Sequence, residues 1–143
     1  MKPFVSKESE RAFRAFEKEC FKNLSFSNLH EVGGVLYALP DYVFDFKGFF
    51  VLRAGLRLGE VKNGRFEPSH SLALATKKED WKNAVDLSET DPRLQKYLRG
   101  ETIEDPTAKN GWCVVCVAGF PVGLGKVVNG VVKNHIPKGL RIN

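Results

Sequence analysis

Residues 127–132 read Val-Val-Asn-Gly-Val-Val, a stretch in which two β-prone pairs flank an Asn-Gly dipeptide. Asn-Gly readily occupies the two positive-φ positions of a type I′ turn, so the stretch predicts a tight β-hairpin. A two-residue loop would place Val128 opposite Val131 and Lys126 opposite Lys133. The last quarter of the chain is therefore expected to form antiparallel sheet.

The expected pairing of Lys126 with Lys133 is unfavourable for a protein on its own. Two ammonium groups directly across a strand pair repel each other and destabilise that pair. The surrounding segment, Gly119–Asn143, holds four Lys or Arg residues and one His but no Asp or Glu. We therefore expect this hairpin to bind an anionic group, and phosphate is the first candidate.

Residues 60–67 predict a second hairpin of the same kind, again with Asn-Gly at the turn. Here Lys62 would lie opposite Arg65. An acidic residue on each strand, Glu60 and Glu67, would be close enough to offset the two positive charges. Two interpretations stay open for this hairpin, a solvated tip or a second contact with the partner.

Apolar periodicity, capping signals and β-branched runs predict the other elements. These are a helix over Ser6–Leu24 with its aromatic stripe toward the core, strands over Val32–Leu39, Phe49–Val61 and Gly111–Ala118, a short helix entered through Pro68, and a short helix capped by Asp91 and ended by Gly100. One N-terminal helix, two short helices and several strands in tight hairpins predict an α+β fold. Its sheet would be small, mostly antiparallel and barrel-like.

The chain has 143 residues, of which 43% are apolar and 27% charged, and these values are typical of a globular protein. This length predicts one domain, or one domain with a small appendage. Three cysteines without a signal peptide favour a reducing interior over a disulfide scaffold. No apolar run approaches the ~20 residues of a membrane span. We therefore expect a cytoplasmic protein with no membrane partner.

The net charge of +5 is unevenly distributed along the chain. Arg53–His70 contains four Lys or Arg against two Asp or Glu, and Gly111–Asn143 contains four against none, whereas Met1–Leu52 is balanced. A basic surface confined to a few elements is typical of proteins that bind nucleic acid. We expect the excess cations of the two hairpins to converge on one exposed surface. The alternative is a basic surface that only confers solubility.

Catalytic and metal-binding patterns are weak in this sequence. Cys113 and Cys116 are spaced like a metal or redox pair, but residues three apart in a strand point to opposite faces, and no second pair follows. Ser69 and His70 are neighbours without a nucleophile motif around them. The run Gly123-x-Gly125-Lys126 is too short for a phosphate-binding P-loop. We expect no catalytic residue, no metal and no cofactor.

Two segments carry a family resemblance. The first, within Arg53–Ala73, includes Arg-Ala-Gly-Leu-Arg-Leu-Gly and Gly-Arg-Phe-Glu-Pro-Ser-His-Ser-Leu-Ala. The second, within Gly119–Arg141, includes Gly-Phe-Pro-Val-Gly-Leu-Gly-Lys and Lys-Asn-His-Ile-Pro-Lys-Gly-Leu-Arg. Over residues 50–141 the chain resembles the C-terminal RNA-binding, PUA-like region of RsmF-type ribosomal-RNA 5-methylcytosine methyltransferases.

The resemblance implies a PUA-like pseudo-barrel over residues 49–143 that docks structured RNA, with residues 1–48 as a helix and strand module packed on its core. The sequence lacks the large cofactor-binding domain of those enzymes and their cysteines in Pro-Cys and Thr-Cys contexts. The resemblance thus implies a free-standing, non-catalytic domain without the methyltransferase domain. Leu124 and Ile136 stand where family members often have aromatic residues, which favours contacts to the RNA backbone over base stacking.

The expected RNA-contacting residues fall into two groups, because phosphate contacts position a nucleic acid and more directional hydrogen bonds specify it. The cations expected at phosphates are Arg53, Arg57, Arg65, Lys126, Lys133, Lys138 and Arg141. The residues expected to make the directional hydrogen bonds are His70, Asn134 and His135. The expected partner is ribosomal or transfer RNA, a separately encoded methyltransferase is a further candidate partner, and the chain is expected to be a monomer.

Two other functions stay open. One is a protein-interaction subunit of a methyltransferase or of a ribosome-associated complex. The other is a small hydrolase or transferase that uses His70 or His135, which would require a pocket that converges on the histidine with a carboxylate behind it.

Overall fold

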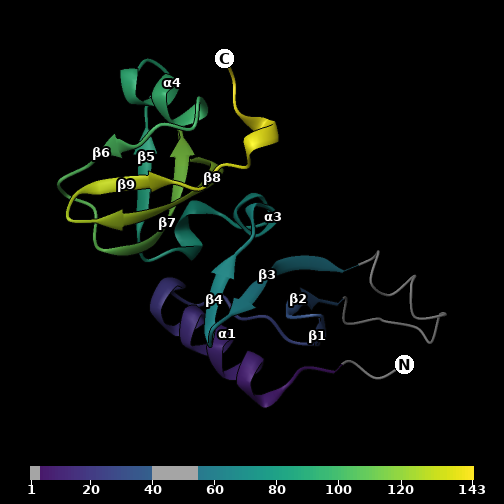
Figure 1. Cartoon of the computed structure of the whole chain (residues 1–143). Helices are drawn as coiled ribbons and strands as arrows, with labels where there is room; N and C mark the ends of the chain where they lie inside the picture. Colours follow the sequence, from purple (N-terminus) through teal and green to yellow (C-terminus); the bar gives the residue numbers. More distant parts are fainter. Residues whose placement is uncertain (1–3, 40–54) are drawn as a thin grey trace. The chain divides into compact units, whose positions relative to one another are not determined.

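The computed structural model describes residues 4–39 and 55–143 (Figure 1). The chain divides into two compact units, Met1–Leu72 and Ala73–Asn143, which are described in turn. The domain boundary expected between residues 48 and 49 lies outside the described residues. Each unit has its own sheet with mostly antiparallel neighbours, and within the described residues one long α-helix and two short ones accompany these sheets. This confirms the expected α+β class.

The first unit is built on helix α1, Lys7–Cys20. Ser6 caps this helix, because its side-chain oxygen accepts a hydrogen bond from a backbone N–H of the first turn at 3.1 Å. Phe13 and Phe16 are buried, and the centroids of their rings lie 4.9 and 4.8 Å from that of Phe66. The expected aromatic stripe is therefore confirmed as part of the core.

Helix α1 ends at Cys20 rather than at Leu24 as predicted. The Glu17 carboxylate, only 8% exposed, accepts a hydrogen bond from the backbone N–H of Phe26 at 2.8 Å. This bond turns the following segment back along the helix. The apolar periodicity that continues to Leu24 therefore belongs to this returning segment and not to a further helical turn.

The sheet of the first unit has the order β1-β2-β3-β4, and all its neighbours are antiparallel. Its strands are β1 (Leu29–Val32), β2 (Val35–Ala38), β3 (Leu56–Lys62) and β4 (Arg65–Pro68). The prediction of one continuous strand over Val32–Leu39 was wrong. Gly33 and Gly34 have φ values of 58° and 84° and form the turn between β1 and β2, a conformation that glycine adopts without steric cost.

The hairpin of β3 and β4 has the predicted register. Lys62 lies opposite Arg65, and Glu60 lies opposite Glu67. The Lys62 ammonium is 3.5 Å from the carboxylate of Glu60 and 3.8 Å from that of Glu67. The two acidic residues thus offset the positive charge at this hairpin, as expected.

The second unit is a five-stranded sheet with the order β5-β7-β8-β9-β6, shown in green and yellow in Figure 1. Its strands are β5 (Ala84–Leu87), β6 (Ile103–Glu104), β7 (Gly111–Val117), β8 (Phe120–Val128) and β9 (Val131–Asn134). The pair β5 and β7 is parallel, and the other neighbours are antiparallel. The other helical elements of the described residues are α3 (His70–Leu74), η1 (Lys78–Asp80), α4 (Pro92–Leu98) and η2 (Lys138–Leu140).

Helix α4 begins and ends as predicted. The Asp91 side chain accepts a hydrogen bond from the backbone N–H of Arg93 at 2.9 Å, Pro92 is the first helical residue, and Gly100 follows the helix at a φ of 91°. No helix within residues 4–39 and 55–143 is long and apolar enough to cross a membrane.

Helix α4 packs on the sheet through Tyr97, which is fully buried. Its hydroxyl donates a hydrogen bond to the backbone carbonyl of Leu124 at 2.8 Å. A Cβ on Gly123 would overlap this hydroxyl, and a Cβ on Gly125 would lie 2.5 Å from Val132 Cγ1. The two glycines of Gly-Leu-Gly-Lys are therefore required by packing, which explains them without a phosphate-binding loop.

Candidate nucleic-acid interface

Strands β8 and β9 form the hairpin expected from the Asn-Gly turn. Lys126 lies opposite Lys133, and Val128 lies opposite Val131. Both turn residues have positive φ values, 49° and 81°, as a type I′ turn requires. The close pairing of two lysines is thus a real feature of the sheet.

Trp112 of β7 extends this lysine pair into a row of three side chains. It lies opposite Lys126, so that Trp112, Lys126 and Lys133 follow one another across β7, β8 and β9. Successive side chains of a strand point to opposite faces. The neighbours Cys113 and Val127 belong to the hydrophobic core, so the row of three points away from that core.

His135 completes this surface. Its exposed ring lies 4.6 Å from the Trp112 ring, centroid to centroid, at an interplanar angle of 65°, which is an edge-to-face arrangement. The Lys126 ammonium lies 5.2 Å from the centroid of the Trp112 ring, within the range of cation–π attraction. Trp112, Lys126, Lys133 and His135 are hereafter called the outward face.

The outward face carries two lysines and no acidic residue, and the nearest acidic residue of the sheet on this side is Glu104 of β6, opposite Val131. The sequence from Gly111 to Asn143 contains no Asp or Glu. Within the described part of the chain, neither Lys126 nor Lys133 forms an ion pair with a carboxylate. The Trp112 ring attracts the Lys126 ammonium and so offsets part of the repulsion between the two lysines. An anion that bridges both ammonium groups would offset more of it.

Asn134 points away from the outward face, and its side chain is hydrogen-bonded within the second unit. Its side-chain amide donates hydrogen bonds to the backbone carbonyls of Tyr97 at 2.7 Å and Glu101 at 3.0 Å. Its side-chain oxygen accepts a hydrogen bond from the N–H of Ile136 at 2.8 Å. These bonds use the amide N–H and the oxygen of the Asn134 side chain, the groups that were expected to bind RNA. They also hold the backbone on either side of His135.

Lys138 and Arg141 lie in the exposed C-terminal segment around η2. Arg141 Nε donates a hydrogen bond to the backbone carbonyl of Ile136 at 3.3 Å. The same side chain passes over Gly100, where an added Cβ would lie 2.5 Å from Arg141 Cδ. The segment that carries both cations is therefore attached to the end of α4 in the second unit.

The expected cations of the first hairpin lie in the first unit. Arg57 of β3 and Arg65 of β4 are exposed, and Arg53 lies outside the described residues. Because the outward face belongs to the second unit, the convergence of all these cations on one surface stays a prediction.

His70 begins α3, a helix of five residues. Its Nδ1 is buried and has no hydrogen-bond partner among the described residues, and burial lowers the pKa of the ring. The hydroxyls of Ser69 and Ser71 both donate to the backbone carbonyl of Arg57, at 2.6 and 2.8 Å. The turn around His70 therefore uses its hydroxyls internally, and a contact between His70 and RNA remains a prediction.

Two comparisons with known families cover most of the chain. Residues 15–76 match the RsmF rRNA methyltransferase first C-terminal domain, and residues 82–142 match the Methyltransferase RsmF PUA domain. Two successive domains of one protein family thus match here in order.

The chain belongs to the family of RsmF C-terminal domains.

The curated relatives that the chain resembles are named ribosomal RNA small subunit methyltransferase F. That of Shewanella oneidensis is 28% identical over 90 residues, covering 62% of this chain and 18% of the relative. Those of Shewanella sp. W3-18-1 and Shewanella putrefaciens are each 33% identical over 93 residues, covering 62% of this chain and 19% of the relative. The chain spans about a fifth of the length of these relatives.

The RsmF PUA match includes the whole outward face, of which the sequence analysis missed Trp112. Trp112 was placed in the strand predicted over Gly111–Ala118 and was not among the residues expected to contact RNA. The sequence signal that could have indicated Trp112 is its place in a predicted strand directly before the terminal hairpin. However, the pairing of β7 with β8 shifts between Val115 and Cys116, so counting back from the turn does not give Lys126 as the partner of Trp112.

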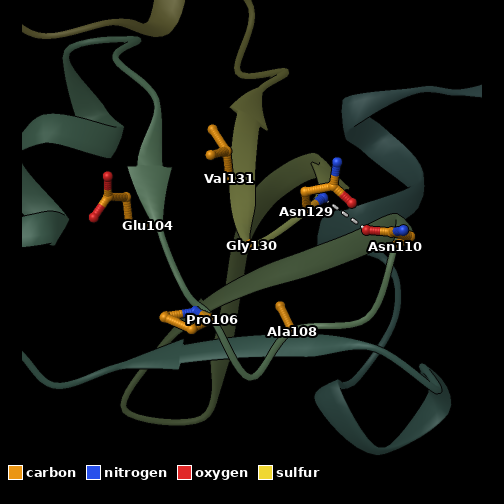
Figure 2. A pocket seen from close by; sticks show the side chains of 7 residues that line it. All are labelled: Glu104, Pro106, Ala108, Asn110, Asn129, Gly130 and Val131. Atoms are coloured by element: carbon orange, nitrogen blue, oxygen red, sulfur yellow. Dashed lines mark hydrogen bonds between the residues drawn. The ribbon is translucent and has the colours of Figure 1, made fainter.

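A hollow of about 480 Å³ lies beside the turn of this RsmF-type hairpin (Figure 2). The backbone N–H of Asn129 donates to the side-chain oxygen of Asn110 at 2.8 Å and so holds the turn against the preceding loop. The lining residues include Glu104 but no lysine or arginine. The hollow therefore lacks the charge to hold phosphate and is not part of the outward face.

The two cysteines of β7 lie in the interior of the second unit, within the residues that match the RsmF PUA domain. Cys113 and Cys116 are both fully buried and unbonded to each other. Burial raises the pKa of the Cys116 thiol to about 11, so this thiol is protonated at neutral pH. Among the described residues no group of three or more His, Cys, Asp or Glu could hold a metal ion.

Proposed function

We propose that this chain is a non-catalytic RNA-binding module that docks structured ribosomal or transfer RNA through the outward face. The observation that carries this proposal is the in-register pair of Lys126 and Lys133, neither of which forms an ion pair with a carboxylate within the described residues. A phosphate between the two ammonium groups would replace their repulsion by two attractions. The family supports an RNA-binding role in ribosomal-RNA modification, since the matched relatives are named ribosomal RNA methyltransferases.

In this proposal the other cations extend the phosphate contacts beyond the outward face. They are Lys138 and Arg141 of the second unit and Arg53, Arg57 and Arg65 of the first. Each cation that neutralises a phosphate releases condensed counterions, which contributes affinity but no sequence specificity. His135 and His70 would add more directional contacts, and Asn134 would position His135.

The module itself would transfer no methyl group. The module would act as a monomeric protein that holds the RNA, while a methyltransferase domain supplies the chemistry. In this proposal that methyltransferase domain is supplied by a separately encoded partner protein.

Replacement of both Lys126 and Lys133 by alanine is expected to weaken RNA binding by about 25-fold at 0.1 M salt. Each phosphate contact contributes about 0.7 to the slope of log K against log salt. Two contacts therefore contribute about 1.4, which corresponds to about 25-fold in affinity over the tenfold difference between 0.1 M and 1 M salt, where these contacts are taken to add nothing. The melting temperature should stay the same or rise, because the substitutions remove a like-charge pair. Equilibrium titration with a structured RNA and a thermal melt measure both effects.

The matched control is the double variant Lys96→Ala/Lys109→Ala, which removes two exposed lysines of the same unit outside the outward face. It should bind RNA within about threefold of the parent protein, since it changes net charge equally but loses no proposed phosphate contact. Equal losses in the two double variants would show that only net charge matters. Unfolding of the Lys126/Lys133 variant would show that the pair is structural, and the proposal would fail.

A further inference from the structure

We propose that the outward face holds one unpaired base of its RNA, stacked on the ring of His135 and with its edge against the ring of Trp112, with the neighbouring phosphates on Lys126 and Lys133. This inference rests on the RNA-binding function proposed above and names the class of RNA. The bound segment would be a loop, bulge or single strand that exposes at least one base, and not a continuous duplex.

The backbone that carries the two rings is held in place before any RNA arrives. Trp112 is half-buried in β7, so packing fixes its ring. The backbone N–H of His135 donates to the carbonyl of Leu124 at 3.2 Å, and the neighbouring Asn134 amide is bonded on both sides. A ring that is already ordered loses little conformational entropy when a base stacks on it.

Lys126 connects the rings with the phosphates. Its ammonium lies over the Trp112 ring in the free protein, at the end of a flexible four-carbon stem. A phosphate carries a full negative charge, whereas the ring offers only its quadrupole, so the ammonium is expected to move to the phosphate when RNA binds. This movement would uncover the ring face and expose it to the base.

An unpaired base fits this surface better than a duplex does. Bases within a duplex are stacked on both faces, and the deep major groove of an RNA helix does not admit side chains. Aromatic side chains flanked by cations are the common means by which proteins hold unpaired nucleotides, and every base offers a face to stack on.

The positions at which relatives often carry aromatic residues do not provide this surface. Leu124 is 1% exposed and Ile136 is 5% exposed, so both belong to the interior. The expectation of backbone contacts alone followed from these two residues. Trp112 and His135 instead supply aromatic rings on the adjacent strand and beyond the end of β9.

The test compares a single-stranded ten-nucleotide RNA with a blunt duplex of the same length, using the whole chain. The parent protein should bind the single strand at least about tenfold more tightly than the duplex. His135→Ala should weaken single-strand binding by roughly tenfold, which is the usual effect of losing one base–aromatic stack, and change duplex binding less than about twofold. His135→Phe keeps a ring and should restore most of the affinity.

Two further readouts separate stacking from a structural effect. The slope of affinity against salt should be the same for the parent and His135→Ala, because no phosphate contact is lost. Single-stranded RNA should quench the fluorescence of Trp112. The other tryptophan, Trp81, is 1% exposed with its indole N–H bonded to Thr76 at 2.9 Å, and gives a constant background.

The outcomes distinguish this inference from the function on which it rests. Equal binding of single strand and duplex, no quenching, or equal losses in His135→Ala and His135→Phe would overturn the stacking inference and leave RNA binding standing. Absence of binding to either probe and to structured RNA would overturn both. If His135→Ala proves less stable, His135→Phe and the quenching of the parent protein still decide the question.

Discussion

The affinity for structured RNA is expected to fall on the order of 1,000-fold between 50 and 200 mM salt. Seven cations are proposed to contact phosphates, and each contributes about −0.7 to the slope of log K against log salt, so the total slope is about −5. A fourfold rise in salt then gives a loss of this size. Titrations by fluorescence anisotropy at four or more salt concentrations measure the slope directly.

The slope also tests whether the two units act on one RNA. If only Lys126, Lys133, Lys138 and Arg141 of the second unit contact phosphates, the slope should be about −3 and the loss roughly 50-fold. A slope near −5 requires the cations of the first unit as well. A slope near zero is incompatible with phosphate binding by either set and would leave only the family likeness.

Gly123→Ala is expected to destabilise the second unit by about 3 kcal/mol. The added Cβ would overlap the hydroxyl of Tyr97, a fully buried side chain whose hydroxyl donates to the Leu124 carbonyl. Overpacking costs about 1–3 kcal/mol, and the loss of a buried hydrogen bond costs a similar amount. The sum is a large part of the 5–15 kcal/mol by which a typical domain is stable. Urea unfolding followed by far-ultraviolet circular dichroism measures the change.

Gly139→Ala is the matched control in the same unit. A Cβ at Gly139 has no neighbouring atom within 4 Å, and its backbone is not in the left-handed region. This substitution should change the free energy of unfolding by less than about 0.5 kcal/mol. If both alanine variants were equally stable, the close packing of α4 on β8 would be contradicted, and the glycine pair would need another explanation.

The sequence predicted the two charged hairpins because their geometry is local. In residues 60–67 and 127–132 the Asn-Gly dipeptide sets the turn, and the turn sets the register. The opposition of Lys126 with Lys133, and of Lys62 with Arg65, follows from counting outward along the strands. Helix α4 was predicted for the same reason, since Asp91, Pro92 and Gly100 are signals within one short segment.

Pairings between distant segments were beyond this kind of prediction. The strands β5 and β6 are short and lie next to β7 and β9 only because the chain returns to the sheet after η1 and α4. Gly33-Gly34 carries the same turn signal as Asn-Gly, but the β-prone residues on both sides of it favoured one continuous strand. Sequence patterns do not encode the sheet neighbour that selects between these two interpretations.

The candidate site was predicted in part. Its cations follow from charge counting, whereas the orientation of Asn134 toward Tyr97 and the proximity of Trp112 to His135 depend on tertiary packing. The same packing separates the first hairpin and the outward face into different units. Composition alone therefore predicts a basic surface but cannot say which aromatic rings accompany it.

Chemical-shift mapping with a ¹⁵N-labelled chain and a short single-stranded RNA tests the central claim most directly. The indole N–H of Trp112 and the backbone amides of Lys126, Lys133 and His135 should shift on titration, whereas the indole N–H of the buried Trp81 should not move. Shifts confined to residues outside the outward face, or no shifts at saturating RNA, would contradict the assignment of this surface as the RNA-binding site.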